Sequence, residues 1–201
     1  MTPAYDGWHI DGSAYTEVID LARTAPGWLD TLISVWSTYG LALFALLMVA
    51  GWWRARRAGT PEVVTALAVP LITLLAFGGD ALLKLAVRED RPCQILKVPT
   101  LEACPAHGDW SFPSNHSALA AAAAVALLFV SRRLGILALV AAVLMTASRV
   151  WVGVHYPHDV LAGFLVGASV AFVSAWGVRR NQRALAERLK SGPLRPLVAG
   201  T

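Results

Sequence analysis

Charged residues are scarce in this sequence, and their scarcity argues against an ordinary water-soluble domain. Asp, Glu, Lys and Arg make up 15% of the 201 residues, whereas soluble domains carry about 25%. Hydrophobic residues account for 56% of the chain. The composition therefore favours a membrane protein.

Cysteine is nearly absent as well, and the carboxylates do not gather in the pattern of a metal centre. Cys93 and Cys104 have only His107 nearby, without a recognisable zinc-ligand spacing. Clustered carboxylates for a two-metal site are also missing. We therefore expect no metal and no other cofactor. If the segment faces an oxidising compartment, a Cys93–Cys104 disulfide is favoured, with two free thiols as the alternative.

The first 30 residues lack the basic region that opens a cleavable signal peptide, because most of their charged residues are acidic. The segment 15–23 instead has the pattern of a short helix at the membrane interface. Trp8, Trp28 and Trp36 suit the same boundary between membrane and water. We expect an N-terminal interfacial helix, or a further span if this segment inserts.

Long apolar runs dominate the rest of the chain. Crossing a bilayer core of about 30 Å takes roughly 20 apolar helical residues. Candidate spans cover residues 32–53, 63–87, 114–130, 134–152 and 160–178. The predicted fold class is all-α, a polytopic membrane helical bundle of about five transmembrane helices plus the interfacial helix. We expect an integral-membrane domain over residues 1–182 and a basic, partly disordered cytoplasmic tail over residues 183–201.

Basic residues follow alternate spans, and this pattern predicts an orientation. They occur after the first span, between the third and fourth, and after the fifth, so they share one side if the spans alternate. The positive-inside rule assigns that side to the cytoplasm. The segment 88–112 and the turn "HYPHD" then face outside, as in a multi-pass protein of the bacterial inner (cytoplasmic) membrane. The basic tail suits anionic membrane lipid as a partner, not nucleic acid.

The charged residues near the spans gather at their outward ends, where ionisable groups are costly and mark function. They are Lys84, Arg91 and Arg149, with the segments "PSNH" (113–116) and "SRVWVGVHYPHD" (148–159). Arginine and lysine bind phosphate oxygens. A helix start with Ser114 as its N-cap offers unpaired backbone amides to the same anion. The sequence therefore predicts a phosphate ligand.

Two histidines in these segments can divide the chemistry of phosphate cleavage. His155 can attack phosphorus and form a phosphohistidine intermediate, provided that an acceptor orients its other ring nitrogen. Asp159, one helical turn later, can be that acceptor. His116 can protonate the leaving oxygen and then activate water, while the cations stabilise charge on the phosphoryl oxygens.

The same three segments resemble the tripartite pattern of the type 2 phosphatidic acid phosphatase superfamily, which reads K-x6-RP, PS-G-H and SR-x5-H-x3-D. Every spacing fits from Lys84 to Asp159, and the one departure is Asn115 in place of the usual glycine. A polar residue at this position is common in members resembling bacterial undecaprenyl pyrophosphatases of the bacitracin-resistance type.

The resemblance implies that His155 is the nucleophile, that Asp159 orients it and that His116 is the general acid. It also implies a phosphate-binding set: Lys84, Arg91, Ser114, Asn115, Ser148 and Arg149. The implied activity is metal-independent hydrolysis of a lipid (di)phosphate at the outer membrane face. The apolar spans disfavour the soluble vanadium haloperoxidases of the same superfamily.

The motifs specify phosphate cleavage but not the lipid. The outward site and the resemblance favour undecaprenyl diphosphate, hydrolysed to undecaprenyl phosphate during recycling of a cell-wall carrier. Phosphatidylglycerophosphate, phosphatidic acid and prenyl-phosphosugar phosphates are alternative substrates. A lipid or anion transporter without catalysis is the alternative from another class, and the complete histidine set disfavours it.

Several residues near the motifs have competing interpretations. Asp80 lies one helical turn before Lys84 and could pair with it. His158 is interpreted as a turn residue, while Asp109 shapes either substrate access or only its loop. The pattern "GFLVG" (163–167) fits packing within the protomer better than a homodimer face, although it is compatible with a homodimer.

Overall fold

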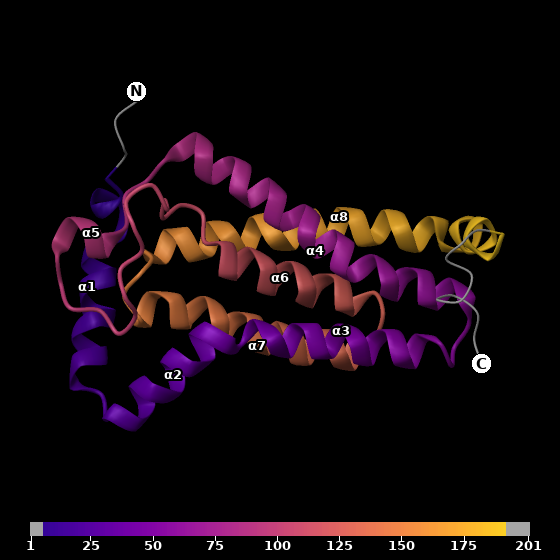
Figure 1. Ribbon diagram of the computed structural model, residues 1–201, viewed down its shortest axis with the longest axis horizontal. Coiled ribbons are helices and arrows are strands. Elements are labelled where there is room, and N and C mark those ends of the chain that lie inside the picture. The colour runs from indigo at the N-terminus through magenta and orange to yellow at the C-terminus, as the bar shows by residue number, and fades with distance from the viewer. Residues whose placement is uncertain (1–5, 192–201) are drawn as a thin grey trace.

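The computed structural model describes residues 6–191, and within that range the chain forms eight helices without a β-strand. They are α1 (Trp8–Thr24), α2 (Gly27–Tyr39), α3 (Leu41–Ala55), α4 (Thr60–Val87), α5 (Pro92–Leu96), α6 (Asn115–Leu128), α7 (Arg132–Trp151) and α8 (Pro157–Lys190). The longest helices follow one axis, whereas α1 lies across one end of the bundle (Figure 1). The predicted all-α membrane bundle is confirmed.

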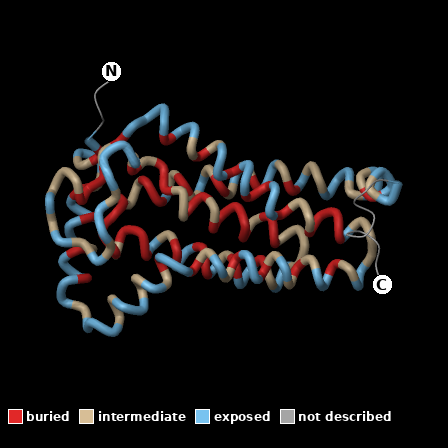
Figure 2. Tube along the Cα trace, viewed as in Figure 1, coloured by how far each residue is buried: buried red, intermediate tan, exposed pale blue. Residues whose placement is uncertain are grey.

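α6 is the centre of the bundle, and its alanine-rich sequence explains this position. It packs against α4, α7 and α8, and it is buried along most of its length (Figure 2). Small side chains let neighbouring backbones approach closely. The fully buried alanines are Ala118, Ala120, Ala121, Ala122, Ala123, Ala124 and Ala126. This packing fixes the start of α6 relative to its neighbours.

Two glycines of α8 allow this helix to touch the backbone of α6. A Cβ atom at Gly163 would lie 2.4 Å from the carbonyl oxygen of Ser114, and one at Gly167 would lie 2.1 Å from that of Ala118. Such distances are too short for carbon and oxygen, so any larger residue would push the helices apart. The "GFLVG" pattern therefore packs within the protomer, as the sequence favoured.

The candidate spans differ in part from the five expected. α4, α7 and α8 are long and apolar enough to cross a membrane, and α2 with α3 forms one broken span bent by 54°. α6 has 14 residues, or about 21 Å at the helical rise of 1.5 Å per residue, so it is shorter than a full span, although it lies along the same axis as α4 and α8 (Figure 1). By length and composition, the described residues thus hold three candidate spans, or four with the bent pair. Because helices surround α6, lipid thickness does not dictate its length.

The two ends of the chain only partly follow the expectation. The interfacial helix is longer than residues 15–23, since α1 covers Trp8–Thr24, and it contacts α7 and α8 without joining the spans. In the expected tail, residues 183–190 continue α8. Residues 192–201 lie outside the described part of the chain.

A disulfide closes part of the connection between α4 and α6. Cys93 in α5 is bonded to Cys104, with their Cα atoms 5.9 Å apart. The side-chain amide of Gln94 donates a hydrogen bond to the carbonyl of Pro105 at 2.9 Å. The expected disulfide is confirmed, and it attaches the 97–112 loop to the short α5.

Candidate active site

The residues of the three sequence motifs come together at the end of the bundle that α1 covers. The end of α4, the start of α6, the end of α7 and the start of α8 all lie there (Figure 1). These elements and their adjoining loops carry Lys84, Arg91, Ser114, Asn115, His116, Ser148, Arg149, His155 and Asp159. Residues far apart in the sequence thus form one polar group inside an apolar bundle.

His155 is nearly fully buried, with 2% of its surface exposed, and its two ring nitrogens have different partners. Nε2 lies 3.1 Å from Nη1 of Arg91. A guanidinium N–H can only donate, so Nε2 is the acceptor and carries the lone pair. Nδ1 then holds the proton and faces Oδ2 of Asp159 at 3.4 Å. This tautomer is the one that a nucleophilic Nε2 requires.

Asp159 is held in place by donors other than His155. Its Oδ2 accepts hydrogen bonds from the hydroxyl of Ser111 and from the backbone N–H of Tyr156, the latter at 2.8 Å. The Ser111 oxygen also lies 3.4 Å from Nδ1 of His155. Because the carboxylate is fully buried, these bonds fix the direction in which it faces the imidazole.

The surroundings of His155 favour its neutral form. Burial lowers the pKa of His155 well below its ordinary value of 6.5, and the positive charges of Arg91, Arg149 and Lys84 lower it further. His116 contributes to the same field, which places it within electrostatic reach of the ring. The imidazole therefore keeps its lone pair at neutral pH.

Arg91 and Lys84 share a carboxylate partner on the 97–112 loop. Nη2 of Arg91 lies 3.0 Å from Oδ1 of Asp109, and its Nε donates to the Asp109 carbonyl at 2.8 Å. Nζ of Lys84 lies 3.9 Å from the same Oδ1 and donates to the carbonyl of Trp110 at 2.8 Å. Both cations are buried, so two positive charges converge in a place with little water.

Arg149 supplies a third buried cation from the last turn of α7. Its Nη1 lies 2.9 Å from Oε2 and 3.2 Å from Oε1 of Glu102. The same nitrogen donates to the hydroxyl of Ser37 on α2. Arg149 thus joins α2, α7 and the 97–112 loop.

The start of α6 presents polar atoms to the same region. The Ser114 backbone N–H donates to the carbonyl of Asp159 at 3.0 Å. Ser114 is the N-cap residue, as expected, but its hydroxyl makes no capping bond. Within the described residues neither this hydroxyl nor Oδ1 of Asn115 has a hydrogen-bond partner. Buried polar atoms are normally paired, so the Ser114 hydroxyl is free to donate to a bound anion.

Two residues have partners other than those expected. The hydroxyl of Ser148 donates to the carbonyl of Met145 at 2.7 Å, inside its own helix. Asp80 is fully buried, yet its carboxylate has no hydrogen-bond partner among the described residues. The expected Asp80–Lys84 pair is not formed, because Lys84 extends instead toward the carbonyl of Trp110.

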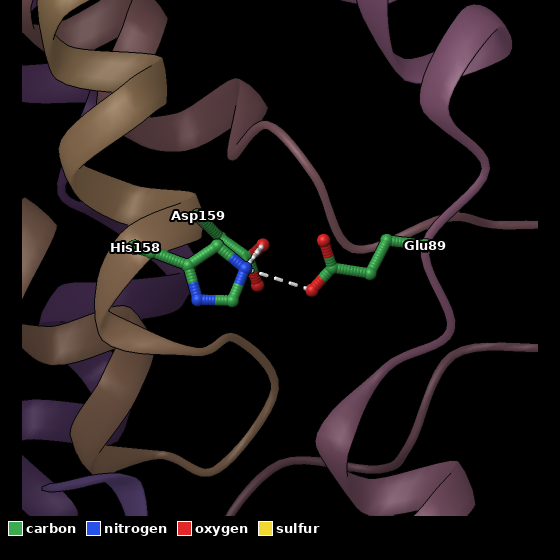
Figure 3. Close-up of side chains that lie close together, drawn as sticks. All are labelled: Glu89, His158 and Asp159. Carbon is green, nitrogen blue, oxygen red and sulfur yellow. Dashed lines mark hydrogen bonds and ion pairs between the residues drawn. The ribbon is translucent and has the colours of Figure 1, made fainter. Parts of the chain in front are cut away.

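A second cluster of ionisable groups lies beside Asp159 (Figure 3). His158 Nε2 lies 2.9 Å from Oε1 of Glu89 and 3.4 Å from Oδ1 of Asp159, and Nδ1 lies 2.7 Å from Oδ1 of Asp11. Glu89, His158 and Asp159 are spaced closely enough to hold a metal ion. Carboxylates on both sides of one imidazole also suit a doubly protonated ring that donates from both nitrogens. His158 therefore connects α8 to α1 and to the segment that follows α4. The interpretation of His158 as a turn residue did not anticipate these contacts.

An apolar cavity of about 460 Å³ lies between α2 and α7, next to the polar group. Ser148 lines it, and the following residue is Arg149, whose guanidinium belongs to the polar group. The indole N–H of Trp151 donates to Asp30 at 2.9 Å and ties the two helices together beside the cavity. The apolar lining includes Leu29, Leu32, Trp36, Leu144, Ala147 and Trp151. An apolar chain fits such a space when its charged end reaches the cations.

Some residues of the site carry no signal in the sequence. Ser37, Ser111 and Glu102 contact Arg149 or Asp159, but none stands at a fixed distance from a motif. Only the proximity of Ser111 to "PSNH" could have drawn attention to it.

Comparison with known proteins agrees with this geometry. The sequence model of the PAP2 superfamily matches residues 65–183, which include all three motifs. Undecaprenyl-diphosphatase BcrC of Bacillus subtilis is 32% identical over 145 residues, 72% of this chain and 72% of the relative. An undecaprenyl-diphosphatase of Sulfolobus acidocaldarius is 33% identical over 152 residues, 73% of this chain and 69% of the relative. The crystal structure of Aquifex aeolicus LpxE has a TM-score of 0.59 at 26% identity, covering 82% of this chain and 94% of that chain.

Proposed function

This chain belongs to the PAP2 superfamily and is a membrane lipid phosphatase. We propose that it hydrolyses a polyprenyl diphosphate, namely undecaprenyl diphosphate, to the monophosphate and phosphate. The arrangement of Arg91, His155 and Asp159 carries the chemical part of this proposal. It leaves the lone pair of a neutral imidazole on Nε2, beside a cation that binds phosphate oxygens.

In the proposed reaction, Nε2 of His155 attacks the terminal phosphorus. The bond from phosphorus to the bridging oxygen breaks, and His116 gives its proton to the lipid monophosphate that leaves. The Nδ1 proton stays between His155 and Asp159, so the phosphohistidine retains its orientation. Lys84, Arg91 and Arg149 stabilise the charge on the phosphoryl oxygens.

Water completes the proposed cycle. His116, now without its proton, takes one from a water molecule that attacks the phosphohistidine. The N–P bond breaks, phosphate is released, and both histidines return to their first states. Ser114 and Asn115 add contacts from the start of α6, where backbone N–H groups favour anions.

The apolar cavity between α2 and α7 supports a lipid substrate with a long hydrocarbon chain. Its lining offers almost nothing but hydrocarbon and aromatic surface, and its lining residue Ser148 directly precedes Arg149. The names of the two relatives support a polyprenyl diphosphate over phosphatidylglycerophosphate or phosphatidic acid. We propose that the site lies at the outer face of a bacterial inner membrane, because the basic residues that follow α3, open α7 and end α8 lie at the opposite end of the bundle.

Phosphate release from a short-chain prenyl diphosphate in detergent, with a chelator present, tests this function. We expect hydrolysis in the wild type and near-complete loss in His155→Ala and in His116→Ala. His9→Ala, on the exposed surface of α1, is the matched control and should retain activity. Robust turnover by His155→Ala would refute its role as nucleophile, and faster release from monophosphate glycerolipids would refute the proposed substrate.

A further inference from the structure

Every cation of the site is neutralised by a carboxylate of the same loop. Glu102 contacts Arg149 through both of its oxygens, at 2.9 and 3.2 Å. Asp109 contacts Arg91 at 3.0 Å and lies 3.9 Å from Lys84. A carboxylate resembles part of a phosphate group, since both present coplanar pairs of oxygen atoms to a guanidinium. The two acidic residues thus occupy the positions that phosphoryl oxygens would take.

The exposure of these side chains shows from which side the contacts are made. The side chains of Arg91 and Arg149 are 5% and 7% exposed, whereas those of Asp109 and Glu102 are 52% and 21% exposed. The cations are anchored inside the bundle, and the carboxylates approach them from the solvent side. The carboxylates can therefore move away without unpacking the helices.

The 97–112 loop is fixed to the rest of the chain at two points. After moving away, its two carboxylates can therefore return to their contacts with the cations. The Cys93–Cys104 disulfide holds it two residues after Glu102. The backbone N–H of Ser111 donates to the carbonyl of Glu89 at 2.7 Å and holds it two residues after Asp109. Each carboxylate thus lies next to a fixed point of the chain.

We propose that Glu102 and Asp109 are specificity-determining residues that occupy the phosphate-binding cations in the free enzyme and exclude anions of single charge. This inference rests on the proposed function of the same site. A ligand must outcompete two tethered carboxylates. The head groups of ordinary phospholipids are phosphodiesters with one negative charge, whereas a terminal phosphate or diphosphate carries more charge and three free oxygens. The carboxylates thereby keep abundant membrane phospholipids out of the cationic site.

A purely structural role for the two carboxylates predicts the opposite result on mutation. If they only hold the cations in position, their loss weakens the binding of every anion. If they compete with anions, their loss strengthens it, because the positive charge of the site is no longer offset. The direction of the change in phosphate affinity therefore separates the two roles.

The test compares the wild type with Glu102→Gln and Asp109→Asn, which keep the shape of each side chain and remove its charge. Hydrolysis of the prenyl diphosphate is measured in detergent micelles with added inorganic phosphate or with increasing phosphatidylglycerol, a phosphodiester. We expect each variant to lower the inhibition constant of phosphate by roughly fivefold or more. Phosphatidylglycerol, a weak inhibitor of the wild type, should become a competitive inhibitor of both variants.

Glu187→Gln is the matched control, because Glu187 forms an exposed ion pair with Lys190 at the far end of α8. Its inhibition constants should equal those of the wild type. A higher inhibition constant for phosphate in Glu102→Gln and Asp109→Asn, or unchanged inhibition by phosphatidylglycerol, would overturn the inference. The wild type is assayed first, so absence of hydrolysis would count against the proposed function instead.

Discussion

At the scale of single residues, the proposed mechanism depends on the protonation state of His155. Burial and the neighbouring cations hold the pKa of this imidazole below 6.5. The protonated form therefore accumulates only when the pH falls below the pKa of an ordinary histidine. This form has no lone pair on Nε2. The proposed nucleophilic attack at neutral pH then needs no prior deprotonation of His155.

A titration can verify this state directly. At pH 6.5, where an ordinary histidine is half protonated, we expect His155 to remain neutral because burial disfavours its charged form. NMR spectra of the protein labelled at its histidine rings, with the His155 signal assigned from its loss in His155→Gln, would report the protonation state. A midpoint at or above 6.5 would contradict the expectation.

We expect Ser111 to be a positioning residue that acts on the proposed chemistry through Asp159. Its hydroxyl donates to the carboxylate oxygen that faces His155. We expect Ser111→Ala to lower kcat by about 10-fold or more, the size of effect seen when partners that orient a metal-bound histidine are removed, with little change in KM. Ser111→Thr keeps a hydroxyl and should restore part of kcat. Equal losses in the two variants would indicate that packing, not the hydrogen bond, matters.

At the scale of helices, the contact between α6 and α8 positions the start of α6, where we propose that phosphate binds. Gly163→Ala would place a methyl group 2.4 Å from the Ser114 carbonyl. Overpacking of this kind costs about 1–3 kcal/mol, so we expect a lower Tm in detergent and lower activity. Thermal unfolding followed by tryptophan fluorescence measures the first effect.

Gly177→Ala provides the comparison for that substitution on the same helix. No atom lies within 4 Å of a Cβ built at Gly177, and alanine favours the helix by up to about 1 kcal/mol. We expect an unchanged or higher Tm and full activity. If both substitutions lowered the Tm equally, the close approach at Gly163 would not explain its effect.

The positions of site residues could be predicted from the sequence where a motif fixes their spacing. Lys84, Ser114 and Asp159 could be assigned to one membrane face, because the alternation of spans brings their helix ends together. Glu102 and Ser37 could not be assigned, because their contacts with Arg149 depend on how a loop and a bent helix fold over the bundle.

The number of candidate spans differs from the expected five for a related physical reason. Hydropathy marks residues 114–130 as apolar, but it does not distinguish contact with lipid from contact with other helices. α6 is apolar because α4, α7 and α8 surround it. The break between α2 and α3 lies at Gly40, within the expected span 32–53, and hydropathy alone did not predict its 54° bend.

At the scale of the whole molecule, the proposed orientation separates the two ends of the bundle by the membrane. Both native cysteines are in a disulfide, so labelling of a single introduced cysteine can report on which side of the membrane that residue lies. In intact cells we expect a membrane-impermeant maleimide to label Asp20→Cys on α1 but not Arg183→Cys on α8. Both positions are exposed, and both should react after the membrane is permeabilised.

The reverse labelling pattern would place the catalytic site in the cytoplasm. Labelling of both variants in intact cells would instead indicate that molecules insert in two orientations. Either result would remove the link to a carrier lipid that is released outside the cell.

The position of α1 has a practical consequence for producing this protein. Tyr15 bonds to the carbonyl of Gly153 and Asp11 to His158, so α1 is attached to the chain on either side of His155. A fluorescent or affinity fusion placed before α1 would crowd the catalytic end, whereas one placed after α8 would project from the other end of the bundle (Figure 1). Purification handles therefore belong at the C-terminus.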